Sequence, residues 1–451
     1  MDEPGTDALG RTDMDMPNAR IMKACRNQIQ LREVDLDSLL AAEHPARVVW
    51  AFVERLDLSH LYAKIKAIGD RPGRPAIDPR ILMALWLLAT LDGVGSAREL
   101  DRLCREHDAY RWICGGVEVN YHTLSDFRVE DVEFLDGLLT NIVAALMMTG
   151  KVTLNRVAQD GIRVRASAGA SSFRRRQRLE EFRKVAEEQV NRLHEEIAAD
   201  PAACTKRQQA ARERAVCERE ERISQALKEM ELLEAQRAAT DDKGRKLKKP
   251  RKQGGKPDTR PIPRASTTDP QARKMKGPDG GTRPSYNGQF STDTASQIIV
   301  GVSVDNGGAD SDQLPPMTEQ LHQRYARTPK ETLVDSGYRS FEQMERASAL
   351  GTTVYAPVAE SRSDKRKKNQ PVRGDTPTIA EWRLRMDTEQ AKAIYKERAA
   401  TAECVNAQAR NRGLRQFLVR GTKKVRAVLL WFALAHNLWR IAHPMAQPLA
   451  A

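Results

Sequence analysis

Three acidic residues of the chain lie in patterns that suit metal-dependent chemistry on phosphate esters. Asp160 ends a predicted strand and precedes Gly161, Asp335 ends a second predicted strand before Ser336, and Glu403 lies inside a predicted helix. Phosphoryl transfer between two metal ions needs several carboxylates on rigid elements, because one ion activates the attacking oxygen and the other steadies the leaving oxygen. The pattern therefore allows a metal-dependent phosphoryl-transfer site. Ordinary strand-end turns are the alternative for both aspartates.

The helix that carries Glu403 is predicted from about 387 to 412. Lys396 and Arg410 are each seven residues from Glu403, so the three side chains share one stripe of a regular helix. On the same geometry Arg398, five residues before Glu403, lies off that stripe. A carboxylate between cations is either a salt-bridged surface residue or a metal ligand flanked by phosphate-binding side chains.

The chain is basic, with 451 residues, a net charge of +13 and a pI near 9.5. Nine Lys or Arg face one Asp in 243–260, seven basic residues and no acidic one lie in 410–426, and a third basic run is 364–368. A lone run of this kind is usually a solvated loop. Three runs in one chain favour a polyanionic partner such as a nucleic-acid backbone.

Composition argues against several other classes of protein. The six cysteines include no pair at metal-ligand or redox-motif spacing, so neither a zinc site nor a disulfide framework is expected. The first ten residues are acidic and lack the pattern of a signal peptide. The longest apolar runs, 81–89 and 427–435, are too short to span a bilayer. We therefore expect a soluble cytoplasmic protein that makes no contact with a membrane.

The first third of the chain is predicted to be helical. Asp78 is a helix N-cap followed by proline, and Ser96 with Glu99 has the form of a capping box. A third helix is predicted from near Thr123 to Gly150. Short helices at this spacing suit a DNA-binding domain of the helix-turn-helix type, and they suit a plain helical bundle equally well.

Strand patterns begin at residue 151 and are then interrupted. Residues 174–238 switch to a charged helical pattern that Asp200-Pro201 breaks in two, which indicates an antiparallel helical hairpin or, alternatively, a dimerising coiled coil. Strand patterns resume beyond a basic Gly/Pro-rich stretch, which indicates an α/β core. The predicted division is a loose N-terminus (1–35), a helical domain (36–150), a core (151–172 and 265–445), a helical insertion (173–240) and a basic linker (241–264).

Five blocks of sequence, in this order, resemble the DDE transposases of bacterial insertion sequences. The resemblance covers roughly residues 30–445, and the order of the blocks makes it specific. The blocks are RPGRPAIDPRILMALWLLATLDGVGSARELDRLCREHDAYRWICGG with NYHTLSDFR, then VAQDGIRVRASAG, STTDPQARKMKGPDGGTRPSYNGQ, LVDSGYRS, and a Tyr-x-x-Arg…Glu signature from Tyr395 to Glu403.

This resemblance implies a fold and a set of catalytic residues. The fold is α/β, a ribonuclease-H-like core interrupted by a long helical-hairpin insertion and preceded by an all-α N-terminal domain. Asp160, Asp335 and Glu403 become the metal ligands and catalytic residues for two ions, Mg²⁺ or Mn²⁺. Glu397 is a rival for the third carboxylate. The acidic cluster of Asp305, Asp310 and Asp312 is interpreted as a loop, and a supporting role near the metals is the alternative.

The resemblance also implies contacts with DNA. Tyr395 and Arg398 would contact DNA or support the glutamate, and Arg410 takes the position of a basic residue usual in the family. Residues that alternate with Ile162 and Val164, or that belong to the 243–260 run, are expected to meet a DNA backbone. These are Arg163, Arg165, Lys248, Lys249 and Arg251.

The implied function is cleavage of DNA at the ends of an insertion sequence and transfer of the freed strands into target DNA. The expected partners are transposon-end DNA, target DNA and a second copy of the chain in a homodimer. Two other interpretations stay open. One is a decayed transposase that acts only as a DNA-binding protein, and the other is a metal nuclease without strand transfer.

Overall fold

The computed structural model describes residues 35–67, 75–200, 205–239, 260–277, 279–359 and 369–443. The predicted DNA contacts Lys248, Lys249 and Arg251, the basic run 364–368 and the predicted loose segment up to residue 34 lie outside these residues. Among the helices described, none is long and apolar enough to cross a membrane.

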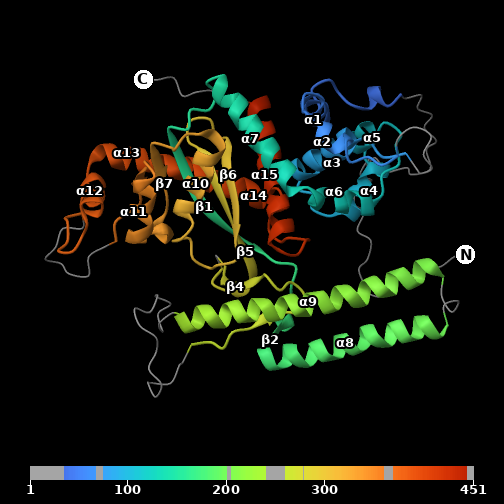
Figure 1. The fold of residues 1–451 in the computed structure, drawn as a ribbon. Helices are drawn as coiled ribbons and strands as arrows, with labels where there is room; N and C mark the ends of the chain where they lie inside the picture. Colours follow the sequence, from blue (N-terminus) through green and yellow to red (C-terminus); the bar gives the residue numbers. More distant parts are fainter. Residues whose placement is uncertain are drawn as a thin grey trace, which may run out of the picture.

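The N-terminal region is helical (Figure 1), as the sequence predicts. Asp78 and Ser96 cap helices as expected, accepting hydrogen bonds from the backbone of Arg80 and Glu99. The single helix predicted from Thr123 is wrong, because Asp131 ends one helix and caps the next through the backbone N–H of Phe134. The helices are α1 (Pro45–Glu54), α2 (Ser59–Tyr62), α3 (Pro79–Leu91), α4 (Ala97–Glu106), α5 (Asp108–Cys114), α6 (Tyr121–Glu130) and α7 (Val132–Met148), after a 3-10 turn at Asp37–Leu39.

A mixed sheet forms the centre of the molecule, with β1 in its middle. One edge of β1 pairs antiparallel with β5 and the other pairs parallel with β7, to which β8 adds in parallel. The other edge of β5 pairs antiparallel with β4 and β6 at different points along its length. The strands are β1 (Arg156–Arg165), β4 (Arg273–Lys276), β5 (Thr282–Asp293), β6 (Ile299–Asp305), β7 (Glu331–Leu333) and β8 (Thr353–Tyr355).

Helices cover the sheet, and the last of them ties it to the N-terminal region. The side chains of α15 are buried almost without interruption from Val425 to Leu438, because this helix packs against α3, α6, α7 and β6 at once. Trp431 of α15 donates a 2.9 Å hydrogen bond to the backbone oxygen of Arg128. The helices of this half are α10 (Leu314–Tyr325), α11 (Phe341–Ala349), α12 (Pro377–Arg385), α13 (Glu389–Arg398), α14 (Cys404–Asn411) and α15 (Thr422–Ala442).

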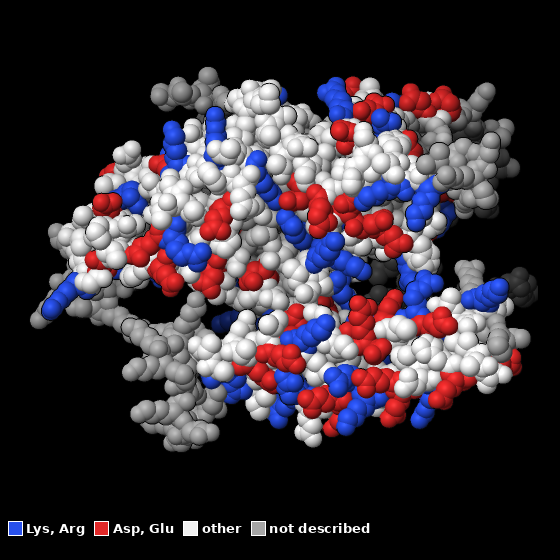
Figure 2. Space-filling model, viewed as in Figure 1, with Lys and Arg blue, Asp and Glu red and all other residues white. Residues whose placement is uncertain are grey.

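Two long helices, α8 (Arg176–Ala199) and α9 (Lys206–Ala239), lie side by side along one side of the molecule (Figure 1). They run antiparallel within one chain, since Arg176 at the start of α8 pairs with Glu234 near the end of α9 at 2.7 Å. Near the other end Arg212 pairs with Glu196 at 2.9 Å. The helical-hairpin interpretation therefore holds for this segment. Figure 2 shows that Lys and Arg alternate with Asp and Glu over the visible face of the pair.

The hairpin meets the rest of the chain through a short two-stranded sheet. β2 (Phe173–Arg174), which directly precedes α8, pairs antiparallel with β3 (Ala265–Ser266). Leu179 of α8 packs with Met230 of α9 and Ala265 in a small apolar cluster. The start of α8 and the end of α9 are therefore held together by the β2–β3 pair and this cluster.

Candidate active site

The register of two parallel strands sets Asp160 beside Asp335. Ala158 of β1 is the partner of Leu333 of β7, and each aspartate lies two residues beyond its member of this pair. Val334 continues the pairing by donating a 2.9 Å hydrogen bond to Tyr355, and the backbone at Asp335 is extended. Neighbouring strands lie about 4.8 Å apart, and residues two apart point to the same face. The two carboxylates therefore start from adjacent strands on one face.

Asp160 does not end its strand, contrary to the prediction. β1 continues to Arg165, and Asp160 is the partner of Phe290 on β5. The Asp-Gly pair suggested a turn, but Ile162 and Val164 are buried and extend the strand past Gly161. Asp335 follows its strand as predicted and caps a 3-10 turn, where it accepts a 2.7 Å hydrogen bond from the backbone of Gly337.

The helix that carries Glu403 contains a π-helical segment, which the sequence prediction missed. α13 ends at Arg398, the π-helical segment spans Ala399–Glu403, and α14 begins at Cys404. A π-helix bonds residue i to residue i+5, so residues five apart come together on one side. The expectation that Arg398 lies off the stripe of Glu403 is therefore wrong. Lys396, on the far side of the segment, loses the α-helical period on which its alignment with Glu403 was based.

Arg398 joins the first and third acidic residues. Its Nη2 lies 3.0 Å from Oδ2 of Asp160, and its Nη1 lies 2.8 Å from Oε1 of Glu403. The Arg398 side chain is 10 % exposed and that of Glu403 is 58 % exposed. The guanidinium is therefore fixed in the interior, while the Glu403 carboxylate is open to solvent.

The charge state of Asp160 depends on its burial and on its acidic neighbours. Burial raises the pKa of Asp160 to about 6, against the lowering effect of Arg398. The negative charges of Asp335 and Asp310 each raise this pKa further. Like charges at one site are stabilised by a cation, and here the guanidinium of Arg398 supplies one.

Asp310, which the sequence analysis assigned to a loop, belongs to this group of carboxylates. Its Oδ1 accepts hydrogen bonds from the side-chain amides of Asn287 at 2.6 Å and Gln289 at 2.8 Å, both on β5. A Cβ added at Gly161 would lie 2.5 Å from the same oxygen. A side chain at position 161 would therefore collide with Asp310. Tyr338 donates a hydrogen bond to the side-chain oxygen of Gln289 and completes the network.

Two further side chains position the aspartates. Asn406 of α14, three residues after Glu403, donates a 3.1 Å hydrogen bond to Oδ2 of Asp160. Tyr395 of α13 donates a 3.2 Å hydrogen bond to the backbone oxygen of Val334, the residue before Asp335. Asn406 carried no sequence signal beyond its helical spacing from Glu403. Tyr395 was expected to contact DNA or support the glutamate, and here it holds the backbone that leads to Asp335.

The other predicted DNA contacts that the structure describes lie at the surface. Arg163 and Arg165 point away from the core as expected, since the alternate residues are buried. The Arg163 guanidinium donates to the backbone oxygens of Lys276 at 2.8 Å and Gly308 at 2.9 Å, so it holds the loop that leads to Asp310. Arg165 and Arg410 are exposed.

Glu397, the rival third carboxylate, is engaged elsewhere. It forms an ion pair with Arg156 at the start of β1, and the same guanidinium binds Glu331 at 2.6 Å. Arg156 precedes Asp160 by four residues along an extended strand, which corresponds to about 13 Å. The geometry therefore favours Glu403 over Glu397 as the partner of Asp160.

The donor set suits a hard divalent cation. Mg²⁺ and Mn²⁺ prefer carboxylate and amide oxygens. The site offers the carboxylates of Asp160 and Asp335 from adjacent strands. The buried Oδ1 atoms of Asn287 and Asn406, close to Asp160 and Gly161, have no hydrogen-bond partner among the described residues. In the described part of the chain no three His, Cys, Asp or Glu side chains form a closed ligand cluster as they stand. Glu403 instead points its carboxylate at Arg398.

Comparison with protein families assigns the chain. A family model described as a transposase domain (DUF772) matches residues 34–130, and one described as a transposase DDE domain matches residues 239–438. The chain belongs to the DDE transposases of insertion sequences. No curated protein and no solved structure matches it. The domains of this transposase indicate an enzyme of transposition and DNA recombination, and a DDE domain implies a ribonuclease-H-like fold.

The two matched ranges divide the acidic residues unequally. Asp335 and Glu403 lie within the DDE match, whereas β1 and Asp160 lie outside both ranges. The grouping of Asp160 with Asp335 and Glu403 thus depends on the strand register and on the contact with Arg398.

Proposed function

We propose that this transposase catalyses metal-dependent cleavage of DNA at the ends of an insertion sequence and strand transfer into target DNA. Asp160, Asp335 and Glu403 are its catalytic carboxylates. The observation that carries the proposal is the parallel register of β1 and β7, which sets the two aspartates side by side. The contact of Arg398 with both Asp160 and Glu403 adds the third carboxylate to the same site.

The proposed architecture follows the same sheet. Residues 151–172 and 265–445 form a ribonuclease-H-like core, 173–240 form a helical insertion and 241–264 a basic linker, and residues 36–150 form a helical N-terminal domain. The sheet supports this division, because its two halves, β1 and the strands from β4 on, flank α8 and α9 in the sequence.

The proposed chemistry has two steps. Water attacks a phosphodiester at the end of the element and the bond to the 3′ oxygen breaks, which leaves a 3′ hydroxyl. That hydroxyl then attacks a phosphodiester of the target in line. When bound, two Mg²⁺ or Mn²⁺ ions supply Lewis-acid stabilisation and lower the pKa of the attacking group. Asp160, Asp335 and Glu403 would hold these ions.

The remaining side chains prepare the site for this chemistry. Asn406 orients the Asp160 carboxylate, and Tyr395 fixes the backbone that leads to Asp335. Arg398 pairs with Asp160 and with Glu403, and its rigid guanidinium fork is suited to grip a phosphate.

DNA contacts are proposed at the surface around the site. Arg163, Arg165 and Arg410 would meet the backbone near the carboxylates, and Lys248, Lys249 and Arg251 would meet it from the linker. Such contacts give an affinity that falls steeply with salt. Transposon-end DNA, target DNA and a second copy of the chain in a homodimer are the partners.

The test is cleavage of DNA that carries the ends of the element, in Mg²⁺ or Mn²⁺, by the wild type beside Asp160→Ala, Asp335→Ala and Glu403→Ala. Each substitution should abolish cutting, and DNA binding measured in parallel should survive. Glu397→Ala is the matched control, since Glu397 lies in the neighbouring helix but pairs with Arg156. Retained cutting by Glu403→Ala with loss in Glu397→Ala would transfer the third role to Glu397.

Product analysis separates the other two interpretations. Joined products in which the element's 3′ ends are linked to target DNA support a transposase, whereas nicked products alone indicate a metal nuclease. Binding of end DNA by the wild type without any cutting, with either metal, indicates a decayed transposase.

A further inference from the structure

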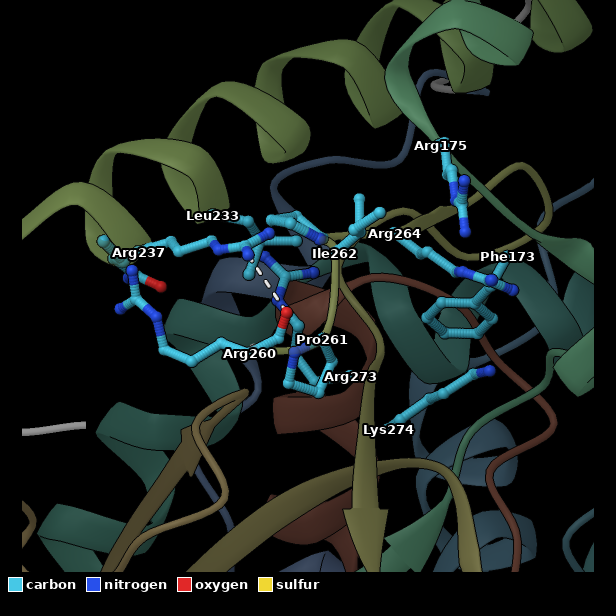
Figure 3. Close-up of a pocket in the computed structure, with 12 residues that line it drawn as sticks. Phe173, Arg175, Leu233, Arg237, Arg260, Pro261, Ile262, Arg264, Arg273 and Lys274 are labelled. Atoms are coloured by element: carbon cyan, nitrogen blue, oxygen red, sulfur yellow. Dashed lines mark hydrogen bonds between the residues drawn. The ribbon is translucent and has the colours of Figure 1, made fainter. Parts of the chain in front are cut away.

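A cavity of about 840 Å³ lies where α9 passes over β4 and the stretch 260–264 (Figure 3). Of the twelve residues that line it, six are Lys or Arg and none is Asp or Glu. We call it the cationic pocket. Its basic residues are Arg175, Arg237, Arg260, Arg264, Arg273 and Lys274.

The cations of the pocket differ in whether they pair with an acidic residue. Arg273 is neutralised by an ion pair with Glu229, and Arg237 donates a 3.0 Å hydrogen bond to the backbone oxygen of Arg260. In contrast Arg175, Arg264 and Lys274 are exposed, and none of the three forms an ion pair in the part of the chain that the structure describes. The charged ends of these three gather on the side of the pocket where Phe173 lies (Figure 3).

The cluster is maintained although its charges repel one another. The Lys274 ammonium lies over the ring of Phe173, 5.2 Å from its centroid, and this contact leaves the positive charge uncompensated. Concentrated charge of one sign raises the local concentration of an oppositely charged ligand. The pocket is therefore built to attract an anion.

The chemistry of the lining indicates phosphate groups. Arginine guanidinium groups match phosphate oxygens in a bidentate geometry. Cations lie on two sides of the pocket, which suits a run of phosphates better than a single ion. Between them Ile262, 51 % exposed, offers apolar surface to sugar rings. Stacking of bases is disfavoured, because Phe173 is 3 % exposed and Lys274 covers its face.

We propose that the cationic pocket is a second DNA-contact site, separate from the carboxylates, that grips the phosphodiester backbone without reading its sequence. This inference rests on the proposed function, which makes DNA the substrate. It assigns the contact to the inner side of α9 and not to the outward face of the α8–α9 pair, where charges of both signs alternate (Figure 2).

The experiment compares two triple variants that lose the same charge. The pocket variant carries Arg175→Ala, Arg264→Ala and Lys274→Ala. The control carries Lys184→Ala, Arg192→Ala and Arg214→Ala, which are exposed basic residues of α8 and α9 outside the pocket. Binding of a labelled 30-base-pair duplex of arbitrary sequence to the full chain is followed by anisotropy at several salt concentrations, after thermal unfolding shows that both variants are folded.

The pocket variant should bind about 10-fold to 100-fold more weakly, with the slope of log K against log salt reduced by roughly 2 to 3, since each phosphate contact contributes about 0.9 to that slope. The control should change affinity less than about 3-fold. A pocket variant that binds like the control overturns this inference and leaves the proposed function standing.

Two other outcomes are distinguishable. A wild type that binds no duplex at any salt concentration overturns both the inference and the proposed function. A pocket variant that binds DNA normally but changes its oligomeric state on a sizing column overturns the DNA assignment and indicates an acidic surface of a second copy. An Arg264→Lys variant should recover part of the affinity lost by Arg264→Ala, because it restores the charge without the fork.

Discussion

Nη1 of Arg398 lies 2.8 Å from Oε1 of Glu403, although the two residues are five positions apart in a helical segment. The contact exists because the intervening turn is π-helical. One extra residue in a turn rotates everything beyond it, so the direction of Glu403 relative to Asp160 depends on residues that carry no charge. π-helical turns are frequent at functional sites.

Deletion of Ala400, an exposed residue of the π-helical segment, should turn the segment into a regular α-helix. Arg398 and Glu403 would then lie four positions apart and still pair, but the wider turn that sets the position of Glu403 relative to Asp160 would be lost. Since misplacement by about 1 Å can cost roughly 100-fold in rate, cleavage of end DNA should fall at least that much. Circular dichroism should stay close to wild type. Ala400→Ser, which keeps the length, is the control. Full activity in the deletion variant would show that this turn does not set the site.

Arg398→Ala should destabilise the metal-free chain by about 3 to 5 kcal/mol, because it leaves Asp160 buried beside other carboxylates. Mn²⁺ should restore part of the loss by taking over the neutralising charge. Arg156→Ala is the matched control, since Arg156 also bridges two carboxylates, Glu331 and Glu397.

Thermal unfolding in EDTA and in Mn²⁺ measures both variants. Equal recovery by Mn²⁺ in the two variants, or no recovery in either, would contradict the assignment of a cation site to Asp160 and Glu403.

Gly161→Ala should impair the enzyme while leaving every carboxylate in place. The added methyl group would lie 2.5 Å from Oδ1 of Asp310 and 2.7 Å from Nε2 of Gln289, so the network must shift. Overpacking of this kind costs about 1 to 3 kcal/mol. Gly308→Ala, with no atom within 4 Å of the added group, should be neutral. Urea unfolding and cleavage rates are the measurements, and two indistinguishable variants would refute the crowding argument.

The raised pKa of Asp160 predicts a specific dependence of stability on pH. Burial raises this pKa to about 6, so the folded chain holds the proton more tightly than the unfolded chain. The contribution to stability is therefore fully present below the ordinary pKa of 3.8 and is lost as pH rises through about 6.

In EDTA, the wild type should become more stable relative to Asp160→Asn as pH falls from 7 to 4.5, because asparagine does not titrate. The urea midpoints of both chains across this range measure the difference. A difference that stays constant with pH would mean that Asp160 titrates normally.

The parts of the fold that follow local rules could be predicted from the sequence. Asp78 and Ser96 satisfy backbone N–H groups at helix starts, which is a local event. The break at Asp131 was missed because apolar residues continue on both sides of it. A cap inside an uninterrupted apolar pattern is hard to distinguish from a helix interior.

The acidic residues that lie within motifs could be predicted from the sequence. The residues that hold them in place through contacts could not. Asp335 and Glu403 stand out by type and position, but the role of Asn406 depends on its contact with Asp160, 246 residues away in the chain. Asp310 lies in a loop, as predicted, but the loop assignment does not say what the side chain contacts. Only the pairing of β5 with β1 brings it to Gly161.

The burial of α15 has a consequence for how copies of such an element decay. A premature stop codon just before Thr422 would spare Asp160, Asp335 and Glu403, yet it would remove the helix that fills the space between the sheet and the N-terminal helices. During synthesis the apolar surfaces of those earlier segments stay exposed until the last helix is made. Exposed apolar surfaces favour aggregation and degradation. Counting intact carboxylates in a genome therefore overestimates how many copies can still move.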